Sequence, residues 1–112
     1  MQFEIHAKDI PISEQLRVHI ERRLSFALER FAMRIVKVCV SVGDLNGPRG
    51  GVDKRCQVAI VLMPSTTIVM EDRDSNIYVA INRVADKAGR CIGRRLKRRK
   101  SGGRQTRISE LL

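Results

Sequence analysis

Five basic side chains recur along one face of a long amphipathic segment in the second half of the chain. Their spacing alternates between four and three residues, which keeps them on one side of an α-helix. With Ile81 at the centre of the apolar face, all five fall within about 60° of the opposite pole. A face that serves only solubility normally mixes both signs of charge, so we interpret this row as a contact for a line of phosphates. The alternative is an ordinary solvated face. The row consists of Arg83, Lys87, Arg90, Arg94 and Lys97.

A smaller group with related chemistry lies in the first half of the chain. Arg23, Phe26 and Arg30 share one flank of a helical pattern, with Phe26 facing away from the apolar stripe. A ring between two guanidinium groups can stack on a nucleic-acid base while the arginines contact phosphates. The alternative is that Phe26 covers a sheet edge or a neighbouring subunit.

Residue types that perform catalysis or hold metals form no recognisable set in this sequence. There are 2 histidines, and the 3 cysteines, Cys39, Cys56 and Cys91, make no C-x-x-C pair. We therefore expect no enzyme activity, no metal, no cofactor and no small-molecule substrate. The cysteines are interpreted as reduced, small apolar residues of a cytoplasmic, bacterial protein.

Charge is distributed unevenly along the 112 residues. The net formal charge is +10, from 22 Lys and Arg against 12 Asp and Glu, and residues 90–112 hold 9 of the basic residues and one acidic residue. This balance favours a polyanionic partner and disfavours most free-standing metabolic enzymes. No segment approaches the ~20 apolar residues of a membrane span, and the N-terminus lacks the pattern of a secretion signal. We therefore expect no membrane partner.

The apolar patterning predicts the elements that position these groups. Alternation predicts strands at 2–8, 34–42, 54–63 and 66–71, and helical spacing predicts helices at 13–32 and 75–99. The last three strands have hairpin-sized connections, which is typical of an antiparallel meander. Each helix has an apolar stripe that one face of the sheet can bury. We predict an α+β fold, a two-layer β-α-β-β-β-α sandwich whose four-stranded sheet has both helices on one face.

This pattern predicts one domain at residues 1–99, followed by a basic, flexible tail at residues 100–112. A glycine-rich loop is expected at residues 43–51. The outer face of the sheet, with Cys39, Ala59 and Val61, is apolar enough to permit weak self-association. We therefore expect a monomer or a weak dimer.

With this order of elements, the sequence resembles the ribosome hibernation promoting factor family. That family includes the ribosome-associated translation inhibitor called protein Y, and it has the older label sigma-54 modulation protein. The resemblance covers residues 1 to about 98 and is spread over three segments. Residues 1–5 are similar to the family's opening strand, residues 12–17 and 22–24 to its first helix, and residues 74–82 to the D-x-Y-x-A-I-(D/N) start of its second helix. Without a C-terminal dimerisation domain, the sequence resembles the short form and is not expected to pair ribosomes through such a domain.

The resemblance implies a fold related to double-stranded-RNA-binding domains. It also implies binding to the small ribosomal subunit near the decoding centre, which silences ribosomes during stress. Arg23, Lys87, Arg90 and Arg94 match basic positions of the family and are implied to contact ribosomal RNA, whereas Tyr78 is implied to be structural. Two departures are an extra residue near Phe26, where a lysine common in the family is missing, and a longer loop at residues 43–53.

Two other functions agree with the same residues. The first is a general double-stranded RNA-binding protein with no ribosomal role, because the charge argument applies to any duplex. The second is a protein-interaction module that modulates transcription, as the older family label suggests.

Overall fold

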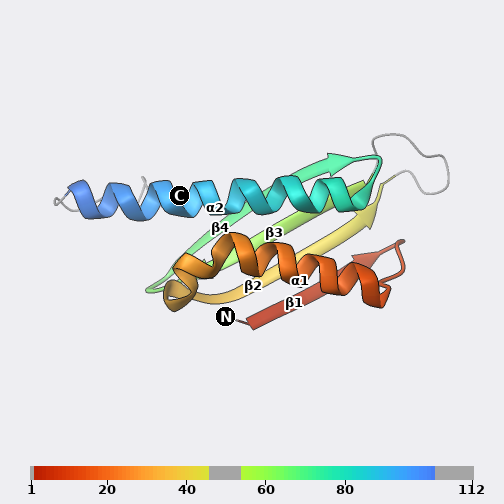
Figure 1. The fold of residues 1–112 in the computed structure, drawn as a ribbon, viewed down its shortest axis with the longest axis horizontal. Coiled ribbons are helices and arrows are strands. Elements are labelled where there is room, and N and C mark those ends of the chain that lie inside the picture. The colour runs from red at the N-terminus through yellow and green to blue at the C-terminus, as the bar shows by residue number, and fades with distance from the viewer. Residues whose placement is uncertain (1, 46–53, 103–112) are drawn as a thin grey trace.

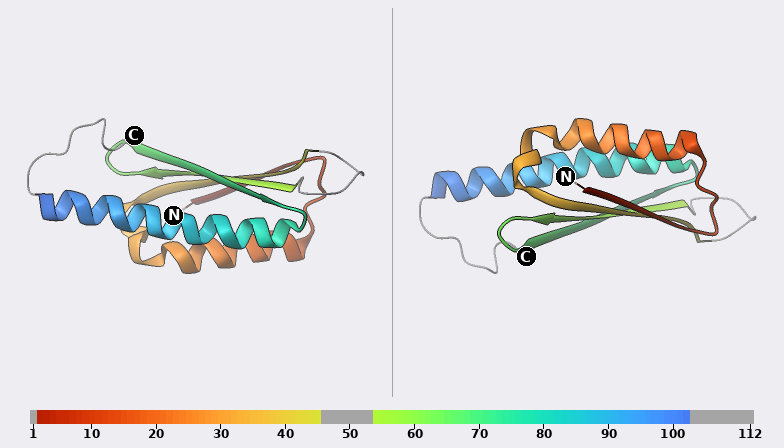
Figure 2. Two further views of the ribbon diagram at one scale, coloured as in Figure 1. Left: turned by 90° about the horizontal axis from the view of Figure 1, so that it is seen from above. Right: turned by 90° about the horizontal axis from the view of Figure 1, so that it is seen from below.

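Four strands form one sheet in the order β1-β2-β3-β4, and both helices pack against the same face of it (Figures 1 and 2). The computed structural model describes residues 2–45 and 54–102, so most of the predicted glycine-rich loop and of the predicted basic tail lies outside the described residues. The elements are β1 (Gln2–Lys8), α1 (Glu14–Leu28), the 3-10 helix η1 (Glu29–Arg34), β2 (Ile35–Asp44), β3 (Lys54–Leu62), β4 (Thr66–Asp74) and α2 (Ile77–Gly102).

The pairing of the strands follows from their connections. β1 pairs in parallel with β2 across the α1 crossover, while β2, β3 and β4 form an antiparallel meander. The predicted α+β architecture, with both helices on one face, is therefore confirmed. None of the helices in the described part of the chain is long and apolar enough to span a membrane.

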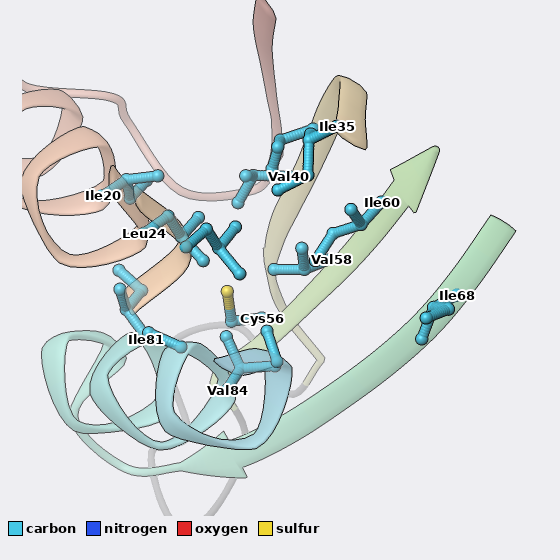
Figure 3. Close-up of a cluster of buried hydrophobic side chains, with 14 of the residues drawn as sticks. Ile20, Leu24, Ile35, Val40, Cys56, Val58, Ile60, Ile68, Ile81 and Val84 are labelled. Carbon is cyan, nitrogen blue, oxygen red and sulfur yellow. The ribbon is translucent and has the colours of Figure 1, made fainter. Parts of the chain in front are cut away.

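Alternation in the central strands determines which side chains enter the core. The inward side chains of β2 and β3 are all buried, and they meet the apolar stripes of α1 and α2 in one cluster (Figure 3). Burial, followed by the nearby charge of Asp72, raises the pKa of the Cys56 thiol to about 12, so this cysteine behaves as a small apolar residue. The central members of the cluster are Ile20, Leu24, Val40, Val58, Ile60, Ile81 and Val84.

The first helix is shorter than predicted. Ser13 caps its N-terminus, with its Oγ accepting a hydrogen bond from the Leu16 N–H at 3.1 Å. The α-helix ends at Leu28, however, and the predicted residues 29–32 belong to η1. A 3-10 turn winds more tightly than an α-helix, and it places the Phe31 ring against α2 before the chain enters β2. The helical pattern in the sequence does not distinguish these two kinds of winding.

The junction between β4 and α2 also differs from the prediction. β4 continues past Glu71 to Asp74, because Asp72 and Asp74 keep their register opposite Cys56 and Lys54 of β3. The cap of α2 is Asn76, whose Oδ1 accepts from the Tyr78 N–H at 2.9 Å. This extension of β4 places two carboxylates on the strand beside α2.

Two glycines of α2 permit the close contact between the helices. A Cβ built on Gly89 would lie 3.1 Å from the carbonyl oxygen of Ala27 in α1. A Cβ on Gly93 would meet only the Phe31 Cζ, at an ordinary 3.6 Å. The lack of side chains at these two positions therefore lets α1 and η1 approach α2 closely.

These distances predict opposite effects for two alanine substitutions. Gly93→Ala should raise the free energy of unfolding by about 0.5–1 kcal/mol, because alanine has the higher helix propensity and fits the available space. Gly89→Ala should lower it by about 1 kcal/mol, because the α1 backbone must move to admit the methyl group. Urea denaturation followed by circular dichroism measures both values. Equal stabilisation by the two variants would contradict the close contact at Gly89.

Candidate nucleic-acid interface

Three arginines surround a hollow between η1 and the middle of α2. Arg90 and Arg94 come from α2 and Arg30 from η1, and together with Phe31 and two α2 glycines they line a space of about 420 Å³. The Arg30 guanidinium lies over the Phe31 ring, 5.0 Å from its centroid. Gly89 and Gly93 contribute only backbone atoms to the α2 side of the hollow. We call Arg30, Arg90 and Arg94 the arginine cluster.

The arginine cluster has no carboxylate partners in the described part of the chain. Among residues 2–45 and 54–96, none forms an ion pair or hydrogen bond with the side chains of Arg30, Arg90 or Arg94. All three side chains are exposed. Guanidinium groups that are exposed and lack a protein partner are available for bidentate contacts with phosphate oxygens.

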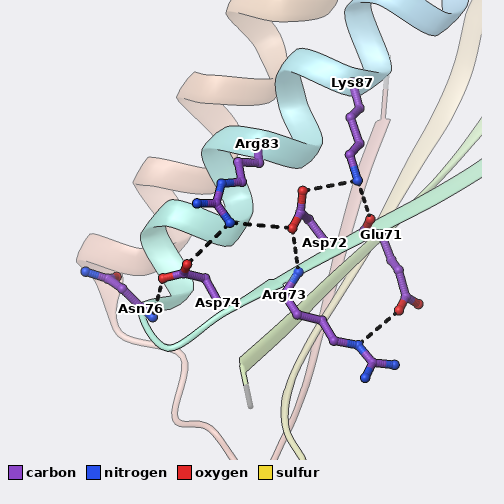
Figure 4. Close-up of polar contacts among 7 residues, drawn as sticks. All are labelled: Glu71, Asp72, Arg73, Asp74, Asn76, Arg83 and Lys87. Atoms are coloured by element: carbon purple, nitrogen blue, oxygen red, sulfur yellow. Dashed lines mark hydrogen bonds and ion pairs between the residues drawn. The ribbon is translucent and has the colours of Figure 1, made fainter. Parts of the chain in front are cut away.

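The other described members of the basic row have carboxylate partners from β4 (Figure 4). Arg83 lies 3.3 Å from Asp74 and 3.8 Å from Asp72. Lys87 Nζ lies 3.1 Å from Asp72 and also donates to the carbonyl oxygen of Glu71 at 3.0 Å. The predicted row is therefore divided into a neutralised part at Arg83 and Lys87 and an unpaired part at Arg90 and Arg94.

The environment of Asp72 keeps this carboxylate ionised. Burial by itself raises the pKa of Asp72. The hydrogen bond from Lys87, the N–H of Arg73 and the charges of Lys87 and Arg83 together outweigh burial, so the pKa of Asp72 is lowered from its usual value. A phosphate that approached Lys87 would therefore compete with an anion already in place.

Arg23 lies in the contact between the two helices. Its Nε donates to Asn82 Oδ1 at 3.0 Å, and its guanidinium lies 3.2 Å from Asp86. Asn82 Oδ1 also lies 2.9 Å from His19 Nε2, and the His19 ring meets the Tyr78 ring edge-on, with 4.8 Å between centroids. This placement gives Arg23 a role in joining α1 to α2, in addition to any contact with RNA.

Phe26 and Lys97 are the remaining predicted site residues. Phe26 is 71% exposed on α1, as its position in the helical pattern predicts. Among the described residues, however, the aromatic ring in contact with Arg30 is Phe31, so Arg30 is not positioned against Phe26. Lys97 lies within α2, and its side chain is outside the described part of the structure.

Sequence reasoning missed two features of this surface. Phe31 lies within the predicted helix 13–32, and its contacts with Gly93 and Arg30 arise only from tertiary packing. Asp72 and Asp74 lie outside the predicted strand at 66–71, although their spacing of two residues continues its alternation. A prediction that extended this strand to Asp74 would have placed both carboxylates beside α2.

Comparisons with known proteins agree with this fold. In solved structures, the N-terminal domain of protein Y from Thermus thermophilus matches with a TM-score of 0.70 and 21% identity, over 84% of this chain and 98% of that one. A ribosomal subunit interface protein from Coxiella burnetii matches with a TM-score of 0.71 and 16% identity, over 87% and 99% of the two chains. No curated protein sequence matches the chain.

A sequence model of a protein family matches most of this chain. The model described as Sigma 54 modulation protein / S30EA ribosomal protein matches residues 3–100, which include every strand and helix up to the last turn of α2. The chain therefore belongs to the Sigma 54 modulation protein / S30EA ribosomal protein family.

Proposed function

We propose that this chain binds the small ribosomal subunit near the decoding centre and blocks translation by occupying space that mRNA and tRNA need. The family and the ribosomal subunit interface protein among its structural neighbours support a ribosome-associated role in the cytoplasm. The observation that carries the proposal is the arginine cluster, a group of unpaired cations around an open hollow. Stress-dependent silencing of ribosomes is the physiological role that this activity would serve.

The proposed mechanism is occlusion rather than catalysis. Arg30, Arg90 and Arg94 contact phosphates of ribosomal RNA at the hollow between η1 and α2. Such contacts read the shape of a folded RNA more than its base sequence. Phe26 offers an exposed ring on which a base can stack.

The division of the basic row predicts unequal contributions to binding. A phosphate at the arginine cluster meets unpaired guanidinium groups, whereas a phosphate at Arg83 or Lys87 must displace Asp72 or Asp74. A phosphate that displaces a carboxylate contributes little to the free energy of RNA binding, because one anion replaces another beside the same cation. We therefore place the centre of the interface at the cluster and the other basic residues at its border.

The alternative functions differ in the partner they require. A general duplex binder would use the same arginines on any double-stranded RNA. A protein-interaction module that modulates transcription is favoured by the family description, which includes sigma-54 modulation. It would bind a component of the transcription machinery in a complex that resists nuclease.

Two double variants with the same change in net charge test the interface. Arg90→Gln with Arg94→Gln should weaken ribosome binding about 100-fold, because two charge-assisted contacts are lost. The dependence of log K on log salt should become shallower by about two units. The matched control, Arg83→Gln with Lys87→Gln, should weaken binding less than about tenfold and change the salt slope by less than about one unit. Sedimentation titrations over a salt series measure both quantities, and circular dichroism checks the fold. Equal losses in the two variants would overturn the assignment of the cluster as the centre.

Competition separates ribosome binding from general RNA binding. Purified small subunits should co-sediment with the protein in the presence of excess duplex RNA, and added protein should inhibit translation of a reporter mRNA in a cell-free system. Loss of binding to any duplex competitor would support the general RNA-binding alternative. No binding to ribosomes at low salt would reject the proposed function and direct attention to a protein partner.

A further inference from the structure

The free edge of β4 runs beside a second basic hollow. β4 is the last strand of the sheet, so one of its two edges has no neighbouring strand among residues 2–45 and 54–102. Thr67, Ile68, Val69 and Met70 form one wall of a hollow of about 300 Å³, and α2 forms the other. An uncovered edge strand presents unpaired N–H and C=O groups to any chain that can lie alongside.

Two hydrogen bonds determine which residues of β4 present these groups. The Met63 N–H, just after β3, donates to the carbonyl oxygen of Arg34, just before β2. Odd-numbered residues along β3 therefore point their N–H and C=O groups toward β2. Even-numbered residues of β3 point theirs toward β4. In the β3–β4 register, the even-numbered residues of β4 then face β3 and the odd-numbered residues face outward. The outward carbonyl oxygen of Glu71, which accepts from Lys87, agrees with this alternation. Thr67 and Val69 therefore point their N–H and C=O groups away from the sheet.

The rest of this edge is already partly occupied. Lys87 takes the outward carbonyl of Glu71, and the Asp72–Arg83–Lys87 contacts hold α2 against that end of β4. At Thr67 and Val69 the hollow opens instead, and Val69 is 55% exposed. An incoming strand would thus find backbone partners over a short stretch at the beginning of β4.

The charge of the hollow indicates the chemistry of that strand. Lys87, which already pairs with Asp72, and Arg95 lie on its α2 wall. The same wall includes Arg90 and Arg94, which make no ion pair with the described residues, and none of the described residues that line the hollow is acidic. Side chains of an added strand alternate between the two faces of the sheet, so every second one would face these cations and the others would lie beside Val69. Acidic residues fit the positions that face the α2 cations, and apolar β-branched residues fit the positions beside Val69.

We propose that the free edge of β4 binds an extended acidic segment of a partner protein, which adds to the sheet as a fifth strand. Main-chain hydrogen bonds to Thr67 and Val69 provide the affinity, and acidic side chains facing α2 provide the selectivity. This site goes beyond RNA binding, since its partner is a protein and its recognition requires the β4 backbone. Because Arg90 and Arg94 line both hollows, the partner would also hinder RNA binding, a consequence that rests on the proposed function.

A pair of synthetic peptides tests the backbone requirement without changing the protein. The probe is an eight-residue peptide of alternating glutamate and valine with blocked ends, and its control has the same sequence with alternate backbone nitrogens methylated. Backbone methylation removes the hydrogen bonds and leaves the charge intact, so binding should fall at least about tenfold. A lysine-for-glutamate peptide should not bind. Fluorescence anisotropy measures the affinities, and amide chemical shifts should change at Thr67–Met70.

A substitution on the strand provides the complementary test. Val69→Pro removes an outward N–H that makes no bond to β3, which an edge strand tolerates, whereas Val69→Thr keeps that N–H. Val69→Pro should weaken peptide binding at least about tenfold and leave ribosome binding within about twofold, and Val69→Thr should leave both unchanged.

Three results would overturn the proposal. They are equal binding of the methylated and unmethylated peptides, shift changes that avoid Thr67–Met70, and binding of a poly-uridylate probe to this hollow in preference to the acidic peptide. The last result would assign the hollow to single-stranded RNA. Failure of the peptide test leaves the ribosome-binding measurements unaffected, so the two proposals fail separately.

Discussion

The contact between α1 and α2 at Gly89 determines where the arginine cluster of the proposed interface lies. Both helices begin at the same end of the sheet and run in the same direction, so the end of α1 reaches the middle of α2 (Figure 1). A residue without a side chain lets the Ala27 carbonyl come this close without displacing the α1 backbone. Since η1 follows directly, this contact delivers Arg30 to the hollow that Arg90 and Arg94 line. The helix packing and the proposed RNA interface are thus consequences of the same glycine positions.

In the described part of the chain, acidic residues pair with the basic residues at the start of α2 and not with the arginine cluster. Asp72 and Asp74 pair with Arg83 and Lys87, and Asp86 pairs with Arg23. Ion pairs of this exposure contribute little to the free energy of folding. Their larger effect is on the surface, because they remove positive potential from the start of α2 and concentrate it around the arginine cluster.

The sequence predicted the architecture well because alternation and helical spacing are local properties of the chain. Val38, Val40 and Val42 of β2 and the stripe from Leu16 to Leu28 each indicated an element and its buried face. Val36 has the same alternation but is 47% exposed, because the register of β2 shifts between Ile35 and Lys37. The charge partners were not predictable in the same way, since Asp72 meets Lys87 only after β4 has extended and α2 has folded back over it. Arg30 lies in the 3-10 helix that follows α1, and its contact with the Phe31 ring and its place beside Arg90 and Arg94 depend on tertiary packing that a helical wheel does not contain.

The four consecutive basic residues 97–100 are weaker evidence for RNA binding than the arginine cluster. α2 has 26 residues and extends past the sheet (Figure 1), and its final turns include the basic residues 97–100. Cations in the last turn of a helix are stabilised by the macrodipole, which offsets part of their mutual repulsion. That effect falls off within one turn, and Arg94 lies more than two turns before Gly102. Neither the macrodipole nor a described carboxylate therefore compensates Arg90 and Arg94, and a polyanion bound at the hollow is the partner that would.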